Sequence, residues 1–205
     1  MAPTRGGDLT TLSYRAFVVC EDHTLDQFVA VPLVSAMLKH VGRPHARVRP
    51  VSNPRLQGIS QVESKFAEIA ERYAKIADLV VFALDRDKQD GTGGRGDRLA
   101  KFTELHSRLA PDVSAKVDIV LAVEETEVWA LWGSRGQLGE GWSTVRAEQH
   151  PKERFFEPLV TKSDALQPGG GRARLIALSL ASGWDSLAGG CDELRELEMR
   201  TRARV

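Results

Sequence analysis

The chain has little cysteine, no long apolar run and no net charge, and the first two of these features each exclude a class of protein. Only Cys20 and Cys191 occur, far apart and outside any Cys-x-x-Cys pattern, so neither a disulfide scaffold nor a structural zinc site is expected. No segment approaches the roughly 20 apolar residues of a membrane span, and the first ten residues hold no apolar run of signal-peptide length. We therefore expect a cytoplasmic protein without membrane contact.

Charge and size set further limits. Lys+Arg and Asp+Glu balance at 28 each, which argues neither for nor against a nucleic-acid partner, because the field that guides a polyanion depends on where the charges lie. A length of 205 residues with 42% apolar residues suits one domain. We predict an α/β core over residues 12–133 and, packed on it, a loop-rich, helical extension over residues 134–205.

Short apolar runs indicate four strands, at residues 15–20, 45–51, 79–84 and 117–123. Helical periodicity separates them, most clearly where Val62, Phe66, Ile69 and Tyr73 recur at steps of three and four residues. The second run alternates apolar with basic residues, as a short or edge strand does. This alternation of strands and helices predicts a parallel, doubly wound sheet with helices on both faces. Further helices are expected at residues 151–162, 172–182 and 191–200.

Acidic residues follow three of these strands: Glu21 and Asp22, then Asp85 and Asp87, then Glu124, Glu125 and Glu127. The carboxyl ends of parallel strands open onto one crevice, the usual ligand site of such folds. Carboxylates crowded there repel one another unless a cation neutralises them, and Mg²⁺ prefers oxygen ligands. The pattern predicts a site for Mg²⁺ or Mn²⁺, although an acid after a single strand also suits the first turn of a helix.

Two points about this site stay open in the sequence. Glu124 and Glu125 are not separated as ligands, and one of them also fits a solvated charge at a helix N-terminus. Downstream basic residues, with Lys152 and Arg154 foremost, fit phosphate binding and equally fit a solvated face.

The acidic motifs resemble those of the Toprim domain, the metal-binding fold shared by topoisomerases, bacterial primases and nucleases of the OLD (overcoming lysogenization defect) family. The family pattern has a glutamate after the first strand and an Asp-x-Asp pair after a later one. Here VVCEDHTLDQFV supplies Glu21, and VVFALDRD supplies Asp85 and Asp87. Asp22 stands where many relatives have glycine.

A later segment extends the resemblance to small stand-alone Toprim-like proteins of bacterial genomes. VEETEVWALWG resembles their Glu-x-Trp-rich element, with Glu127 at its acidic position, and Pro151-Lys152-Glu153 matches an element that often follows. The resemblance spans about residues 15–153.

The resemblance implies a function as well as a fold. Glu21 would be a general acid/base or a metal ligand, and Asp85, Asp87 and Glu127 would be metal ligands. The implied reaction is Mg²⁺-dependent hydrolysis of phosphodiester bonds in DNA or RNA. Proteins of this kind resemble the nuclease part of anti-phage defence systems whose other part is an ATPase, which makes an ATPase partner an expectation.

Three other interpretations remain at this point. The first is a catalytically inactive Toprim-like binding or regulatory module that acts with an ATPase. The second is a nucleotide-sugar transferase, in which Asp-x-Asp after an apolar run holds a metal-bound sugar diphosphate, but the chain is short for it. The third is a signalling receiver domain with Thr126 as the switch residue, but the separation of Glu21 and Asp85 is too long for it.

Overall fold

A computed structural model describes residues 13–86 and 98–205 and shows an α/β fold built on one four-stranded sheet. Its strands are β1 (Arg15–Val19), β2 (Arg47–Pro50), β3 (Leu79–Asp85) and β4 (Val117–Ala122). All neighbouring strands pair in parallel, in the order β2-β1-β3-β4. The prediction of a parallel α/β sheet is confirmed, with β2 as an edge strand. Asp87 lies outside the described residues.

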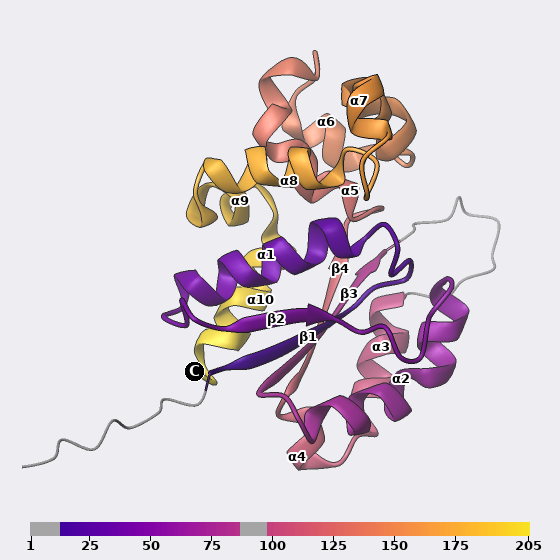
Figure 1. Ribbon diagram of the computed structural model, residues 1–205, viewed down its shortest axis with the longest axis vertical. Helices are drawn as coiled ribbons and strands as arrows, with labels where there is room; N and C mark the ends of the chain where they lie inside the picture. The colour runs from indigo at the N-terminus through magenta and orange to yellow at the C-terminus, as the bar shows by residue number, and fades with distance from the viewer. Residues whose placement is uncertain (1–12, 87–97) are drawn as a thin grey trace, which may run out of the picture.

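Helices cover both faces of the sheet, which explains the continuous apolar runs of its central strands. On one face lies α1 (Gln27–His40), and on the other lie α2 (Ile59–Ala74), α3 (Arg98–Ser107) and the short α4 (Pro111–Ser114) (Figure 1). The first six residues of β3 are fully enclosed between these layers. The regular apolar stripe of α2 packs on β3, where Phe66 lies 4.4 Å from Phe82, ring centroid to ring centroid.

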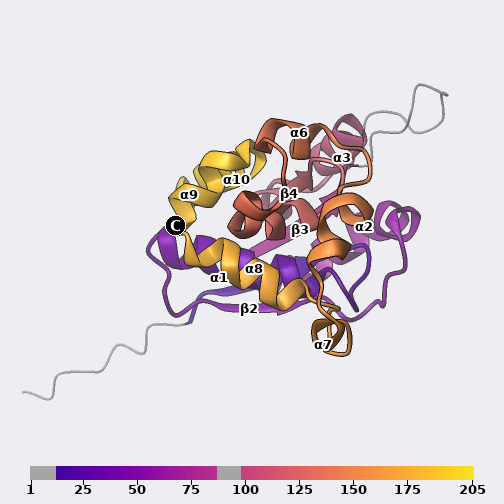
Figure 2. The same ribbon diagram turned by 90° about the horizontal axis from the view of Figure 1, so that it is seen from above.

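The C-terminal part of the chain shares the α1 side of the core. Its elements are α5 (Glu127–Leu131), η1 (Trp132–Gln137), α6 (Trp142–Ala147), η2 (Lys152–Phe156), η3 (Glu157–Leu159), α7 (Lys162–Ala165), α8 (Arg172–Ala181), α9 (Trp184–Gly190) and α10 (Asp192–Arg202). Helix α8 lies alongside α1 (Figure 2). At the contact of α8 with η1, a Cβ on Gly133 would come within 2.3 Å of the Leu178 backbone, so only glycine fits there.

The expected helices differ in outcome. Those predicted at residues 172–182 and 191–200 are present as α8 and α10. The helix predicted over residues 151–162 is present in part, as a π-helical turn at Lys152–Phe156 that passes into a 3₁₀ turn at Glu157–Leu159. Pro158 has no N–H to continue an α-helical ladder. In the described part of the chain no helix is long and apolar enough to cross a membrane.

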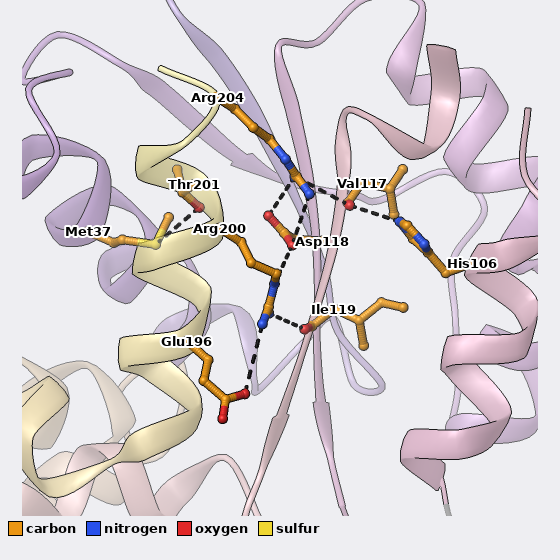
Figure 3. Close-up of polar contacts among 9 residues, drawn as sticks. All are labelled: Met37, His106, Val117, Asp118, Ile119, Glu196, Arg200, Thr201 and Arg204. Carbon is orange, nitrogen blue, oxygen red and sulfur yellow. Dashed lines mark hydrogen bonds and ion pairs between the residues drawn. The ribbon is translucent and has the colours of Figure 1, made fainter. Parts of the chain in front are cut away.

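The outer edge of β4 is covered by arginines at the C-terminal end of the chain (Figure 3). The buried Asp118 accepts hydrogen bonds from Arg200 Nε at 2.8 Å and from Arg204 Nη1 at 2.6 Å. Arg200 Nη2 also donates to the carbonyl oxygen of Ile119 at 2.9 Å. These contacts occupy outward-facing groups of an edge strand, which protects it from pairing with another chain.

Replacing Asp118 should release α10 from this edge. Asp118→Ala removes a buried acceptor of two charged donors, and both arginines are partly exposed and regain water. We expect the free energy of unfolding to fall by about 1–3 kcal/mol, measured by urea denaturation.

Glu196→Ala is the matched control for this experiment. Glu196 lies 3.9 Å from Arg200 and its side chain is 65% exposed, so its removal should change stability by no more than about 0.5 kcal/mol. Equal losses for the two variants would show that burial of Asp118 contributes nothing specific.

Candidate functional site

Glu21 and Asp85 lie side by side at the carboxyl ends of the neighbouring strands β1 and β3. Glu21 Oε1 accepts a hydrogen bond from the backbone N–H of Asp85 at 3.1 Å. The buried Arg98, the first residue of α3, donates from Nη1 to Glu21 Oε1 at 3.2 Å and to the carbonyl oxygen of Asp85 at 2.6 Å. Residues distant in sequence are thus held together by the sheet and by one guanidinium group.

The turn after β4 reaches the same place. The backbone N–H of Thr126 donates to Asp85 Oδ1 at 2.8 Å. Glu124, buried in this turn, has a φ of +69° and is the one non-glycine residue with positive φ in the described ranges. A left-handed backbone conformation at a non-glycine residue costs about 1 kcal/mol. At Glu124 the hydrogen bond from the Arg86 N–H to the Glu124 carbonyl oxygen, at 3.0 Å, stabilises this conformation.

Glu127 is buried beside this turn and forms an ion pair with Arg172. The two side chains are 4% and 6% exposed, respectively. Arg172 is the first residue of α8, and its Nη1 also donates to the carbonyl oxygen of Gly169 at 3.3 Å. The C-terminal extension therefore contributes a cation to the acidic end of the sheet. No local pattern in the sequence indicates this pairing, because the two residues are far apart in the chain.

The electrostatics show how strongly these carboxylates interact. Burial raises the pKa of Asp85 well above its usual value, and the negative charges of Glu21, Asp26 and Glu127 raise it further. Burial also raises the pKa of Asp26 to about 6, with a further contribution from Glu127. The Arg172 charge opposes this rise at Asp26. Asp26, which precedes α1, was not among the predicted site residues; its only sequence signal is its closeness to Glu21.

The other predicted residues are placed differently. The side chain of Glu125 accepts from the backbone N–H of Lys152 at 2.9 Å, and burial raises the pKa of Glu125 to about 7. The guanidinium group of Arg154 contacts Glu148 and, at 3.2 Å, Glu140. The charge that Arg154 was expected to offer to phosphate is thus already balanced by two carboxylates.

Glu21 and Asp85 are the two predicted metal ligands that a direct hydrogen bond joins in the described residues. Within residues 13–86 and 98–205, no three His, Cys, Asp or Glu side chains gather closely enough to form a complete protein cage for a metal. Mg²⁺ does not require one, since one or two carboxylates with waters and substrate phosphates commonly complete its octahedron. The described pair of carboxylates fits that kind of site.

Asp26 should make the stability of the protein depend on pH. Because its pKa is higher in the folded protein than the ordinary 3.8, the stability it contributes is fully present below about pH 4 and is lost as pH rises through about 6. A rise from 3.8 to about 6 corresponds to roughly 3 kcal/mol, as an upper bound. We expect Asp26→Asn, which retains an acceptor for the Asp22 N–H, to be more stable than the wild type at pH 7.

The measurement is the free energy of unfolding in urea at several pH values. The advantage of Asp26→Asn should shrink toward pH 4. A constant difference between the two proteins across this range would contradict the assignment of a raised pKa to Asp26.

Comparison of the chain with protein-family models, with curated proteins and with solved structures gives no match. The resemblance to Toprim domains therefore rests on the short acidic motifs alone. What the protein does has to be argued from the geometry and charge of the residues at this end of the sheet.

Proposed function

We propose that the protein is a Mg²⁺- or Mn²⁺-dependent nuclease, with Glu21 and Asp85 at its centre. One observation carries the proposal: two carboxylates from adjacent parallel strands lie together, and burial, with a further contribution from the surrounding negative charges, raises the pKa of Asp85 well above its usual value. A divalent cation would relieve this repulsion. Such a cation at a phosphodiester activates water and neutralises the charge that develops on the phosphate.

The residues of the chain have separate parts in this proposal. Asp85 is fixed by the Thr126 N–H and would hold the cation, with Asp87 following two residues later. Glu21 is oriented by Arg98 and would hold the cation or accept a proton from the attacking water. Glu127 and Glu124 would act through the electrostatic field and the shape of the turn, because Glu127 is paired with Arg172 and Glu124 is buried in the turn.

The Toprim and OLD-like assignment belongs to the same proposal. It is supported by the parallel sheet, by a glutamate two residues after the end of β1 and by an aspartate at the end of β3. A role as the effector of an anti-phage defence system with an ATPase partner follows from that assignment and from nothing else, since fold alone does not determine function.

A second candidate is an inactive Toprim-like module that acts with an ATPase. The observation in its favour is that two buried guanidinium groups already contact the acids, Arg98 at Glu21 and Arg172 at Glu127. These guanidinium groups already neutralise part of the negative charge of the carboxylates, so less repulsion is left for a metal ion to relieve. Metal binding and cleavage have to be measured separately to distinguish the two candidates.

Metal binding should stabilise the folded protein. A ligand that binds only the folded state adds about 2.7 kcal/mol at a free concentration about 100 times its Kd, so Mg²⁺ or Mn²⁺ should raise the Tm in a thermal melt. Asp85→Asn keeps an acceptor for the Thr126 N–H but removes the charge, and most of the rise should disappear.

Asp112→Asn is the control for this substitution. Asp112 is exposed in α4, which precedes β4 and lies at the opposite end of that strand from the acids. Its metal response should equal that of the wild type. An identical response of Asp85→Asn and Asp112→Asn would remove the support for a metal at Asp85.

Cleavage should depend on the charge of Glu21. Glu21→Gln keeps the size of the side chain and an acceptor for the Asp85 N–H, so the fold should be retained. The rate of cleavage of plasmid DNA or structured RNA should fall at least about a hundredfold, the lower end of a general acid/base contribution.

The assay should be run with and without an ATPase partner, and with EDTA as the metal-free arm. Full activity of Glu21→Gln would remove Glu21 from the mechanism. Metal-dependent stabilisation of the wild type without cleavage under any condition would favour the inactive module.

A further inference from the structure

A long stretch of the chain without Asp or Glu includes β2, the edge strand next to β1 and the candidate site. No Asp or Glu occurs between Asp26 and Glu63, while this stretch contains Lys39 and four arginines. Much of that charge lies on β2 and the segments that flank it. We call this surface the β2 basic edge and define it as Arg43, His45, Arg47, Arg49 and Arg55, all of which are exposed.

The alternation of β2 explains why its arginines face solvent. Val48 packs against the core cluster on the α1 side, so Arg47 and Arg49 point to the opposite face. On that face Arg49 is in register with Phe17 of β1, and Phe17 lies 4.7 Å from the Tyr73 ring of α2. Both arginine positions of this outer strand are exposed, so the two side chains lie in solvent on the α2 side of the sheet.

The charges of this edge are not balanced locally. Among the described residues, no Asp or Glu side chain forms an ion pair with any member of the β2 basic edge. Of these members, Arg43 donates from its side chain to the main-chain oxygen of Val205, at 3.2 Å, so the two arginines of β2 itself are the ones left for an external ligand. Other exposed arginines contrast with this: Arg108 pairs with Glu104, and Arg202 pairs with Glu198. Uncompensated guanidinium groups on one edge of a chain with no net charge favour a polyanionic ligand.

The β2 basic edge leads directly to Glu21. Strand β2 is parallel to β1, so its carboxyl end is at the acidic end of the sheet (Figure 1). The chain that leaves β2 carries Arg55 past the Glu21 turn, where the Gly58 N–H donates to the Glu21 carbonyl oxygen at 3.1 Å and Gln57 bridges to Asp22. A ligand that follows the arginines of β2 therefore arrives beside the candidate site.

We propose that the β2 basic edge binds the phosphate backbone of a nucleic acid and directs it to Glu21 and Asp85. Arginines two residues apart on a strand are about 6.6 Å apart, and each strand of a duplex carries one phosphate charge for roughly every 3.4 Å of helix axis. Arg47 and Arg49 are therefore far enough apart to contact separate phosphates of one strand. That the bound nucleic acid is also the substrate rests on the proposed nuclease function. That the β2 basic edge binds nucleic acid does not depend on that function.

The test is binding of labelled oligonucleotides of mixed sequence to the full chain in EDTA, by fluorescence anisotropy at several salt concentrations. Single-stranded DNA, duplex DNA and RNA are separate arms that identify the preferred nucleic acid. The double substitution Arg47→Gln/Arg49→Gln should weaken binding at least about tenfold at low salt. The plot of log K against log salt concentration has a negative slope, and its magnitude should decrease by about 1.4 to 1.8, the value for two lost phosphate contacts.

The matched control is Arg108→Gln/Arg202→Gln, which removes the same charge from exposed arginines that are already paired. It should leave affinity and slope unchanged. Equal weakening of both double variants would assign the effect to net charge and overturn the proposal. Absence of binding to any nucleic acid at low salt would also overturn it, as would binding of anionic phosphatidylserine vesicles in place of nucleic acid.

The same preparation separates this inference from the nuclease proposal. If the oligonucleotide binds in EDTA through Arg47 and Arg49 but is not cleaved after Mg²⁺ or Mn²⁺ is added, the nuclease proposal fails and the binding edge stands. If cleavage occurs and the double variant binds and cleaves as the wild type does, the nuclease proposal stands and the β2 basic edge is wrong.

Discussion

Repulsion among carboxylates at one end of a parallel sheet is the constraint on which much of this structure depends. Burial raises the pKa values of Asp26 and Asp85, and the negative charges of neighbouring carboxylates raise them further. Buried charges of one sign are costly unless cations or protons offset them. The protein offsets part of this cost with Arg98 from α3 and Arg172 from α8, while burial and the remaining negative charges still raise the pKa of Asp85.

This constraint joins the two halves of the chain. Arg172 belongs to the C-terminal extension, and its ion pair with Glu127 is buried. A buried pair is strongly destabilising to break from one side, because the other charge remains without compensation. Packing of α8 on α1 and α5 is therefore coupled to the charge of the candidate site, and a substitution in the extension should be felt at the acidic end of the sheet.

The arginines at the two edges of the sheet have different partners. The β4 edge is covered by Arg200 and Arg204, whose charges are used internally on Asp118 and on strand carbonyls. The β2 edge ends in Pro50 and carries Arg47 and Arg49 into solvent, and both features discourage pairing with another strand. The difference in how these arginines are used gives the β2 edge its capacity for an external anion, although the whole chain has no net charge.

The local sequence was sufficient for the sheet and for part of the site. Apolar runs such as that of β3 are long, β-rich and bounded by polar residues, so hydrophobic periodicity located all four strands. The parallel arrangement then followed from the alternation of strands and helices. That arrangement also led to the expectation that Glu21 and Asp85 lie at the same end, since parallel strands share their carboxyl ends.

Tertiary structure decided which charges are available. Arg154 and Arg47 are alike in the sequence as exposed basic residues, but Arg154 meets Glu140 and Glu148 while no carboxylate pairs with Arg47 in the described residues. Likewise the sequence predicts Glu127 as a metal ligand, and only the folded chain shows that α8 also brings Arg172 to it. Periodicity reports which face of its own element a residue occupies, whereas an ion pair depends on which distant element packs there, and only the folded chain specifies that contact.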